Sequence, residues 1–202
     1  MDRGNDSGAQ GFADLKARTM ACRECTIGAR ATQSVVGEGD PHAPLMLVGE
    51  QPGDQEDRLG HPFIGPAGHL LSTALHQAGI PRDRCFVSNA VKHFKFELRG
   101  KRRLHKSPGV REIDACRHWL EDEIARVRPQ ALVALGASAA RSLLGRSIGV
   151  TALRGQWLAH EDGLPVLITL HPSAPLRGPP GERDAALAAF VRDLAQARRV
   201  FG

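Results

Sequence analysis

The segment Pro44-Leu45-Met46-Leu47-Val48-Gly49 decides the fold class of this chain. It is a short, continuously apolar run that ends in glycine, and such runs are typical of strands buried on both faces of a parallel sheet. Apolar residues then follow at helical spacing over residues 66–79, where Gly79 marks the end of the helix. A buried strand followed by a helix is the repeating unit of an α/β protein.

The same alternation continues along the chain. Further strands are expected at residues 85–91, 131–135 and 166–170, and further helices at 110–127, 137–144 and 183–200. We therefore predict a three-layer α/β/α sandwich with a central four-stranded parallel sheet, in a single domain that spans residues 1–202.

Length and composition are those of an ordinary globular protein. The chain has 202 residues, of which 42% are hydrophobic and 24% charged, so it can bury one core. Residues 1–10 are polar, and no apolar run approaches the roughly 20 residues that a membrane span needs. We therefore expect a cytoplasmic monomer with no membrane partner.

One short stretch concentrates positive charge. Lysine and arginine outnumber aspartate and glutamate by 27 to 22 over the whole chain, which is compatible with a polyanionic partner. Within residues 92–112, only Glu97 and Glu112 stand against His93, His105 and eight basic residues: Lys92, Lys95, Arg99, Lys101, Arg102, Arg103, Lys106 and Arg111. A charge run by itself indicates a solvated loop, so its context has to decide its role.

Polar side chains follow three of the predicted strands at the points where the strands end. Glu50 comes directly after the first strand, Asn89 lies at the end of the second, and His171 follows the fourth. Each residue alone is explained as a cap or turn residue. Because ligands of parallel α/β sheets bind beyond the carboxyl ends of the strands, the three together predict one pocket.

The order of the motifs around these strand ends resembles that of the family 4 uracil-DNA glycosylases. The resemblance extends from Cys22 to about Arg177, and four motifs carry it: Gly49-Glu50-Gln51-Pro52-Gly53 with Glu56-Asp57, then Pro62-Phe63-Ile64-Gly65-Pro66-Ala67-Gly68, then Asn89, then His171-Pro172-Ser173. Each motif is weak alone, but their order and their placement after strands make the set specific. The uracil-DNA glycosylase fold is itself an α/β/α sandwich, so this resemblance agrees with the predicted architecture.

Two features depart from the common members of that family. Gln51 stands where they usually have a small residue, and the basic stretch that ends in Lys101-Arg102-Arg103-Leu104-His105 is an insertion that they lack. Both features resemble UdgX, a subgroup that remains covalently bonded to the DNA from which it has removed uracil.

The resemblance implies a role for each residue of the uracil pocket. The target base has to leave the DNA stack, or come from a single strand, and enter a tight pocket. Phe63 would stack on the base beside Gly49 and Gln51. The amide of Asn89 would accept from uracil N3–H and donate to O4, a pattern that cytosine reverses. His171 would donate a hydrogen bond to uracil O2 as negative charge develops there.

The resemblance also assigns the residues that act on the sugar and on the DNA. Glu50, Gln51 and His105 would be catalytic, with His105 capturing C1′ of the deoxyribose and Glu50 as its partner. The expected DNA contacts are Lys101, Arg102, Arg103, Ser173 and Arg177, although the three basic residues could instead pin the loop. Single- or double-stranded uracil-containing DNA would be the substrate, and free uracil would be released.

Two other functions stay open at this point. In a multiple-turnover family 4 glycosylase, His105 would only contact phosphate. A non-enzymatic iron–sulfur DNA-binding module is the alternative from another class, and the presence of Glu50, Asn89 and His171 argues against it.

The four cysteines suggest a metal centre. Cys22 and Cys25 form a C-x-x-C pair, whereas Cys85 and Cys116 stand alone. Four thiolates suit zinc or an iron–sulfur cluster, and spacing does not choose between these two or exclude unrelated buried cysteines. The resemblance to family 4 implies a [4Fe–4S] cluster held by all four.

Overall fold

The computed structural model describes residues 6–177 and 179–202, so residues 1–5 of the polar amino-terminal segment lie outside it. Its main sheet has the strand order β1-β3-β2-β6-β8-β7. The four central strands are parallel, as predicted: β2 (Leu45–Gly49), β3 (Cys85–Asn89), β6 (Ala131–Leu135) and β8 (Pro165–Thr169). Two short antiparallel strands that the sequence did not reveal, β1 (Glu38–Gly39) and β7 (Trp157–Ala159), extend the sheet to six.

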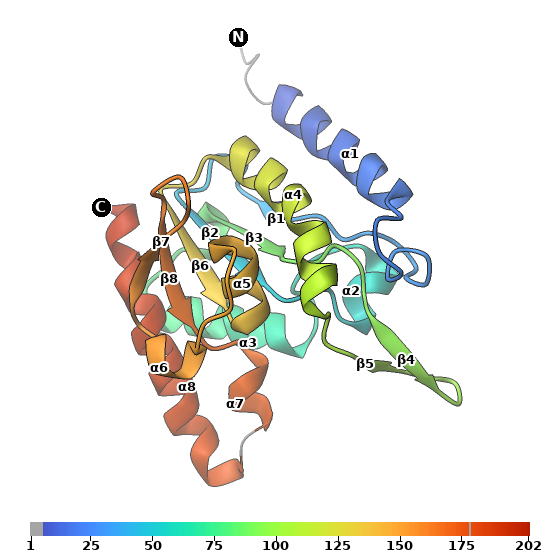
Figure 1. The fold of residues 1–202 in the computed structure, drawn as a ribbon. Helices are drawn as coiled ribbons and strands as arrows, with labels where there is room; N and C mark the ends of the chain where they lie inside the picture. The colour runs from blue at the N-terminus through green and yellow to red at the C-terminus, as the bar shows by residue number, and fades with distance from the viewer. Residues whose placement is uncertain (1–5, 178) are drawn as a thin grey trace.

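Helices cover both faces of this sheet (Figure 1). Side chains alternate along a strand, so Leu45 and Leu47 pack on α3 (Pro66–Gln77) and α8 (Pro180–Ala195). Met46 and Val48 face the opposite side, toward a second group of helices: α4 (Val110–Val127), α5 (Ala137–Leu144) and α6 (Val150–Leu153). The predicted α/β/α sandwich is therefore confirmed.

The boundaries of α4, β6 and α5 agree with the predicted ranges, those of β2, α3 and β8 differ by one or two residues, and β3 and α8 also differ. Strand β3 ends at Asn89 because the chain turns there: the N–H groups of Ala90 and Val91 donate to the carbonyls of Gly49 and Glu50. Helix α8 begins at residue 180, before the predicted start, and continues after residue 195 as the 3₁₀ helix η2 (Gln196–Phe201).

Five helices lie outside the predicted pattern, and α6 is one of them. Helix α1 (Asp6–Ala21) packs against α4, and α2 (Asp54–Leu59) directly follows the first strand end. The remaining two are η1 (Arg82–Arg84) and α7 (Ser173–Arg177), the latter shortly after His171. None of the helices that the structure describes is long and apolar enough to cross a bilayer.

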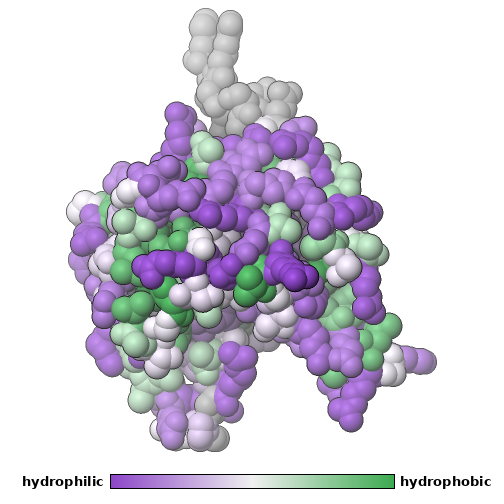
Figure 2. Space-filling model, viewed as in Figure 1, coloured by the Kyte–Doolittle hydropathy of each residue, from purple (hydrophilic) through white to green (hydrophobic). Residues whose placement is uncertain are grey.

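The predicted basic loop is an antiparallel hairpin, which corrects the sequence interpretation. Strands β4 (Phe96–Arg99) and β5 (Arg102–His105) form a separate two-stranded sheet that projects from the body in Figure 1. In Figure 2 this projection ends in a mostly hydrophilic tip at the lower right. Phe96 pairs with His105 and Leu98 with Arg103, so these four side chains share one face of the hairpin.

Candidate active site

A cavity of about 570 Å³ opens beyond the ends of the strands, where the sequence predicted a pocket. A second hollow of about 330 Å³ adjoins it and shares Gln51, His105, His171, Ser173 and Arg177 with it. Phe63 and Asn89 line only the first hollow, whereas Glu50 lines only the second. The hairpin residue His105 therefore lies between the proposed base pocket and the carboxylate of Glu50.

Gly49 brings the ring and the amide of the base pocket close together. The register of β2 and β3 pairs Gly49 with Asn89 at the ends of the two strands. A Cβ at position 49 would lie 2.5 Å from Asn89 Oδ1 and 2.6 Å from Phe63 Cζ. Any side chain there would displace the two groups, so glycine is a requirement of the pocket.

Phe63 is held in an unusual backbone conformation. Its φ of 58° lies in the left-handed region, which costs a non-glycine residue about 1–3 kcal/mol. The start of α3 packs tightly against it, because a Cβ on Gly68 would come within 1.7 Å of the Phe63 carbonyl oxygen. The surrounding chain thus fixes the ring at the pocket wall.

His171 is a neutral imidazole that donates through Nε2. The backbone N–H of Ser173 donates to Nδ1 at 3.2 Å, and the Ser173 hydroxyl lies 2.8 Å from the same nitrogen. Because an N–H needs an acceptor, Nδ1 carries the lone pair and Nε2 the proton. Burial, with smaller contributions from Arg177 and His105, lowers the pKa of His171 to about 4 although Glu50 opposes the shift. A neutral imidazole with its proton on Nε2 is sufficient for the predicted contact to uracil O2.

Glu50 lies between a helix and the hairpin. The hydroxyl of Ser138, in the first turn of α5, donates to Glu50 Oε2 at 2.6 Å. Glu50 Oε1 lies 3.5 Å from His105 Nε2. One carboxylate oxygen is thus fixed, and the other faces the imidazole that the sequence paired with it.

Gln51 holds His105 through an amide whose orientation is set by the backbone. Its Oε1 accepts from the N–H of Lys95 at 3.0 Å, and its Nε2 donates to the carbonyl of Lys106 at 3.0 Å. The same Nε2 lies 2.9 Å from His105 Nε2. Because Gln51 offers a donor at this contact, the lone pair of the imidazole is on its Nε2 and the proton on Nδ1. The side chain thus supports His105, while a direct contact with uracil stays a prediction.

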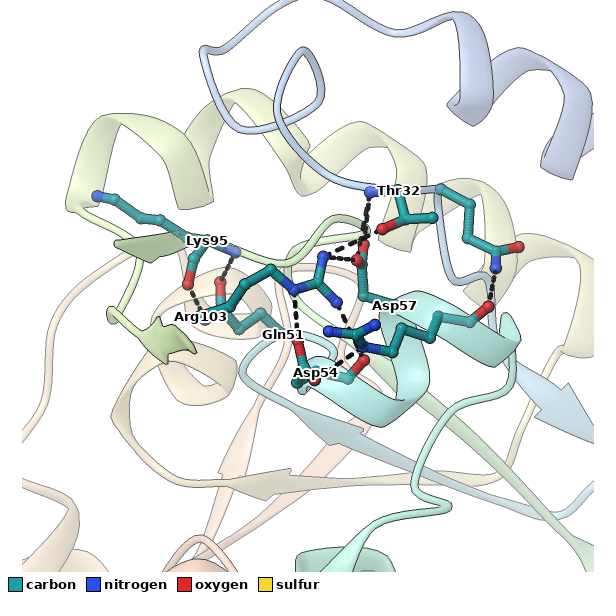
Figure 3. A network of polar contacts seen from close by, with 8 residues as sticks. Thr32, Gln51, Asp54, Asp57, Lys95 and Arg103 are labelled. Atoms are coloured by element: carbon teal, nitrogen blue, oxygen red, sulfur yellow. Dashed lines mark hydrogen bonds and ion pairs between the residues drawn. The ribbon is translucent and has the colours of Figure 1, made fainter. Parts of the chain in front are cut away.

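Arg103 pins the hairpin to α2 (Figure 3). Its guanidinium binds two of the three acidic residues of that helix, Asp54 and Asp57, with Nη1 lying 2.6 Å from Asp57 Oδ2. The Asp57 side chain is fully buried, and that of Arg103 is 12% exposed over the rings of Phe94 and Phe96. Of the two roles considered for Arg103, these contacts favour pinning, and a phosphate contact stays a prediction.

The other predicted DNA contacts differ in their surroundings. Within the described part of the chain, Lys101 and Arg102 lie exposed at the hairpin tip with no hydrogen bond or ion pair. Arg177 is exposed at the end of α7, whereas Ser173 is engaged with His171. The structure therefore leaves two separate basic groups, the hairpin tip and Arg177, free to meet phosphates.

The structure contradicts the assignment of Cys85 to the metal centre. Cys22, Cys25 and Cys116 line one small hollow, together with Gly28 and His93. Cys85 begins β3, at the opposite end of that strand from Asn89, and its thiol donates to the carbonyl of Pro81 in the sheet core. The sequence missed His93, because it appears there only as one member of the basic stretch. A turn that follows Asn89 brings it to the three thiols.

The hollow has the chemistry of a metal centre. Three thiols and one imidazole are soft donors that suit iron–sulfur clusters or zinc. A Cβ on Gly28 would lie 3.4 Å from His93 Cε1, so the wall stays open beside the imidazole. Trp119 belongs to the same apolar cluster as Cys116, and Cys22 and Cys25 pack against that cluster, so the hollow is walled from the core by apolar side chains.

The chain is similar in sequence to known proteins. The uracil DNA glycosylase superfamily domain matches residues 36–195. The type-4 uracil-DNA glycosylase of Thermotoga maritima is 35% identical over 161 residues, which cover 79% of this chain and 80% of the relative. Those of Sulfurisphaera tokodaii and Pyrobaculum aerophilum are 34% and 33% identical, over 82% and 86% of this chain and 76% and 86% of theirs. The chain therefore belongs to the uracil DNA glycosylase superfamily and is a relative of its type-4 members.

Proposed function

We propose that this protein excises uracil from DNA and then remains bonded to the resulting abasic sugar through His105. The excision follows from the pocket and from relatives that are named type-4 uracil-DNA glycosylases. The observation that carries the covalent step is the placement of His105: Gln51 holds its Nε2 at 2.9 Å, and Glu50 lies 3.5 Å away. A glycosylase that uses only water has no need of this arrangement.

Base selection rests on Asn89 and Phe63. The Asn89 side chain is 3% exposed, so an amide there that meets the wrong donor pattern loses its hydrogen bonds. Such a loss costs about 1–3 kcal/mol. Phe63 supplies the surface on which the flipped base stacks, and Gly49 leaves room for both.

Cleavage of the bond between C1′ and N1 leaves both bonding electrons on uracil and positive charge on the sugar. His171 Nε2–H donates to uracil O2 as that oxygen gains charge, and the neutral imidazole needs no proton transfer for this role. Uracil takes its proton from solvent. The carboxylate of Glu50 balances the charge that develops on the sugar.

The lone pair on His105 Nε2 then forms the bond to C1′. The imidazole keeps its proton on Nδ1 and becomes a cation, which the Glu50 carboxylate stabilises until that proton passes to solvent. A well-oriented group competes with water at an effective molarity on the order of 10⁵ M or more. The imidazole therefore captures the sugar, and the protein turns over once.

The cysteine hollow is proposed to hold a [4Fe–4S] cluster through Cys22, Cys25, Cys116 and His93. When bound, such a cluster supplies a structural cross-link rather than redox chemistry. It would join the segment that follows α1, the turn after Asn89, and α4, which together carry the four ligands.

Incubation with a uracil-containing oligonucleotide, followed by denaturing electrophoresis, tests the enzyme proposal. We expect a protein–DNA band that survives boiling in detergent, with free uracil in the supernatant and no band when thymine replaces uracil. Mass spectrometry of the digested adduct should place deoxyribose on His105, and His105→Ser should release uracil without forming the band. Repeated turnover without a band would refute the covalent step, and the absence of uracil release would leave only DNA binding.

The cluster proposal has its own readout. The wild-type protein should be brown and contain iron and inorganic sulfide. Cys85→Ser should keep both, whereas His93→Ala should lose iron and His93→Cys should retain it. Zinc without iron in the wild type, or iron loss in Cys85→Ser with retention in His93→Ala, would contradict the assignment.

A further inference from the structure

A buried ion pair lies directly behind the proposed base pocket. The side chains of Lys92 and Glu123 are both fully buried, and Lys92 Nζ lies 2.7 Å from Glu123 Oε2. Lys92 belongs to the turn after β3, whereas Glu123 belongs to α4. The proposed steps of base release and sugar capture use neither residue.

The ammonium group of Lys92 donates all three of its protons within this site. It donates to the Asn89 carbonyl at 2.7 Å, to Ser88 Oγ at 2.9 Å, and to Glu123. Glu123 in turn accepts from the hydroxyl of Ser88 and, at 2.8 Å, from the N–H of Gly37. Three protons meet three acceptors, so the orientation of Lys92 is fully determined.

The backbone of Lys92 is fixed as tightly as its side chain. Its N–H donates to Cys116 Sγ at 3.3 Å, and its carbonyl accepts from the N–H of Val35 at 2.7 Å. The turn between Asn89 and His93 is therefore anchored to α4 at two points, Cys116 and Glu123, which lie two turns apart on one face of that helix.

Stability alone does not explain a buried ion pair. Replacing such a pair by apolar residues of similar volume is often neutral or stabilising. Here Lys92 donates to the carbonyl of Asn89, which is the last residue of β3 and whose side chain lines the pocket. Asn89 lies where the strand ends and the chain turns away, so the sheet holds it on one side only.

We infer that Lys92 and Glu123 are positioning residues that determine uracil specificity by fixing the backbone of Asn89. The inference rests on the proposed reading of uracil by Asn89. The lysine does not touch the base. Instead, it sets the angle at which the Asn89 amide meets the N3–H and O4 edge, since a rotation of the strand end would misalign both hydrogen bonds.

A double-mutant cycle with Asn89 tests this inference. The variant Lys92→Met with Glu123→Gln removes both charges together, which avoids leaving one of them unpaired in the interior. It is made in the Asn89 and the Asn89→Ala backgrounds, and single-turnover excision of uracil is measured at saturating protein. That rate constant does not depend on the fraction of folded protein. Asp122→Asn on the same helix is the matched control, because Asp122 pairs with Arg18 and Arg126 instead.

We expect the paired variant to slow excision by about tenfold or more when Asn89 is present, and by less than about twofold when it is absent. The Asp122→Asn control should change the rate by less than about twofold in both backgrounds. Equal slowing by the paired variant in both backgrounds would overturn the inference. If the paired variant does not fold, Ser88→Ala carries the same cycle, because it removes one hydrogen-bond partner of the ammonium group and leaves neither buried charge unpaired. Wild-type excision by Asn89→Ala would instead refute the proposed base reading.

Discussion

Substitution of Arg103 by alanine tests whether docking of the hairpin controls the fate of the sugar. The change removes the guanidinium that joins β5 to α2 and leaves the Asp57 carboxylate with the Thr32 N–H as its remaining hydrogen-bond donor. Among the described residues, no hydrogen bond or ion pair joins Arg103 to the pocket residues Asn89 and His171. We therefore expect adduct formation to fail while base release continues.

The magnitude follows from the burial of the pair. Removing one partner of a buried ion pair typically costs about 3–5 kcal/mol. The ion pair of Arg103 with Asp54 contributes little, because Asp54 is 40% exposed. We therefore take the lower end of that range, about 3 kcal/mol, as the cost of removing the Arg103 guanidinium. An isolated two-stranded hairpin is only marginally stable, so this loss falls on the docking of the hairpin. At 1.4 kcal/mol per tenfold, the docked population falls roughly a hundredfold.

The assay measures two products of one reaction. Adduct is quantified on a denaturing gel, and free uracil by chromatography. Arg103→Ala should lower the rate of adduct formation by roughly a hundredfold and that of uracil release by less than about tenfold. Arg103→Lys keeps the positive charge but loses the planar guanidinium that binds two carboxylates at once. Its rate of adduct formation should therefore lie between those of the wild type and Arg103→Ala. Arg58→Ala is the control, because Arg58 pairs with the same Asp54 at a 61% exposed position.

Salt dependence separates docking from a phosphate contact. If Arg103 binds DNA, its loss should lower the slope of log affinity against log salt by about 0.9 for duplex DNA, or about 0.7 for a single strand. Docking predicts an unchanged slope. An unchanged ratio of adduct to uracil, together with a reduced slope, would refute the reasoning.

Further predictions concern the base pocket. Asn89→Asp should weaken uracil excision and admit some cytosine, because a protonated carboxyl can donate where the amide accepts; full selectivity in this variant would count against the assignment. His171→Ala should slow single-turnover excision by about a hundredfold to a thousandfold with DNA affinity retained, and an unchanged rate would exclude the leaving-group role. Because the pKa of His171 is lowered from 6.5 to about 4, excision by His105→Ser should show no change caused by His171 as the pH falls through 6.5, and a step in the rate at pH 6.5 would contradict the burial of this imidazole. The unfolded chain takes up that proton first, so the stability contribution of the neutral His171 is lost as the pH falls from 6.5 toward 4, and a urea titration should register it. Gly49→Ala should reduce excision without unfolding the domain, since the added methyl group meets Asn89 Oδ1 and Phe63 Cζ; wild-type kinetics would show that the pocket relaxes.

Local signals predicted the sheet and its helices, and strand ends predicted the pocket. The strand at residues 131–135 and the helices on either side of it were assigned correctly because their apolar patterns are complete within a few residues. Glu50, Asn89 and His171 were then brought together by a rule of parallel sheets that needs no side-chain detail. Short edge strands such as β7 carry too few residues to show a pattern.

Features that depend on distant partners were not predictable in this way. Phe96 and Leu98 alternate with polar residues as a strand requires, but the surrounding charge suggested a solvated loop. Arg103 resembles its basic neighbours in sequence, and only the fold shows that Asp54 and Asp57 meet it. Counting thiols likewise favoured Cys85, because the turn that carries His93 to the other ligands is set by tertiary structure.

The two halves of the candidate site are held by different forces, and this separates base release from the fate of the sugar. Asn89 and His171 lie at the ends of strands whose positions the buried core fixes, and the carbonyl of Asn89 is also bound by the buried Lys92. His105 lies on a hairpin that polar contacts of Gln51 and Arg103 attach to the body, and a single substitution can weaken such contacts. On the proposed reaction, an undocked hairpin leaves C1′ to water and turns the protein into a multiple-turnover glycosylase. On this proposal, the covalent adduct and repeated turnover differ only in whether the hairpin is docked, and the same pocket binds the base in both cases.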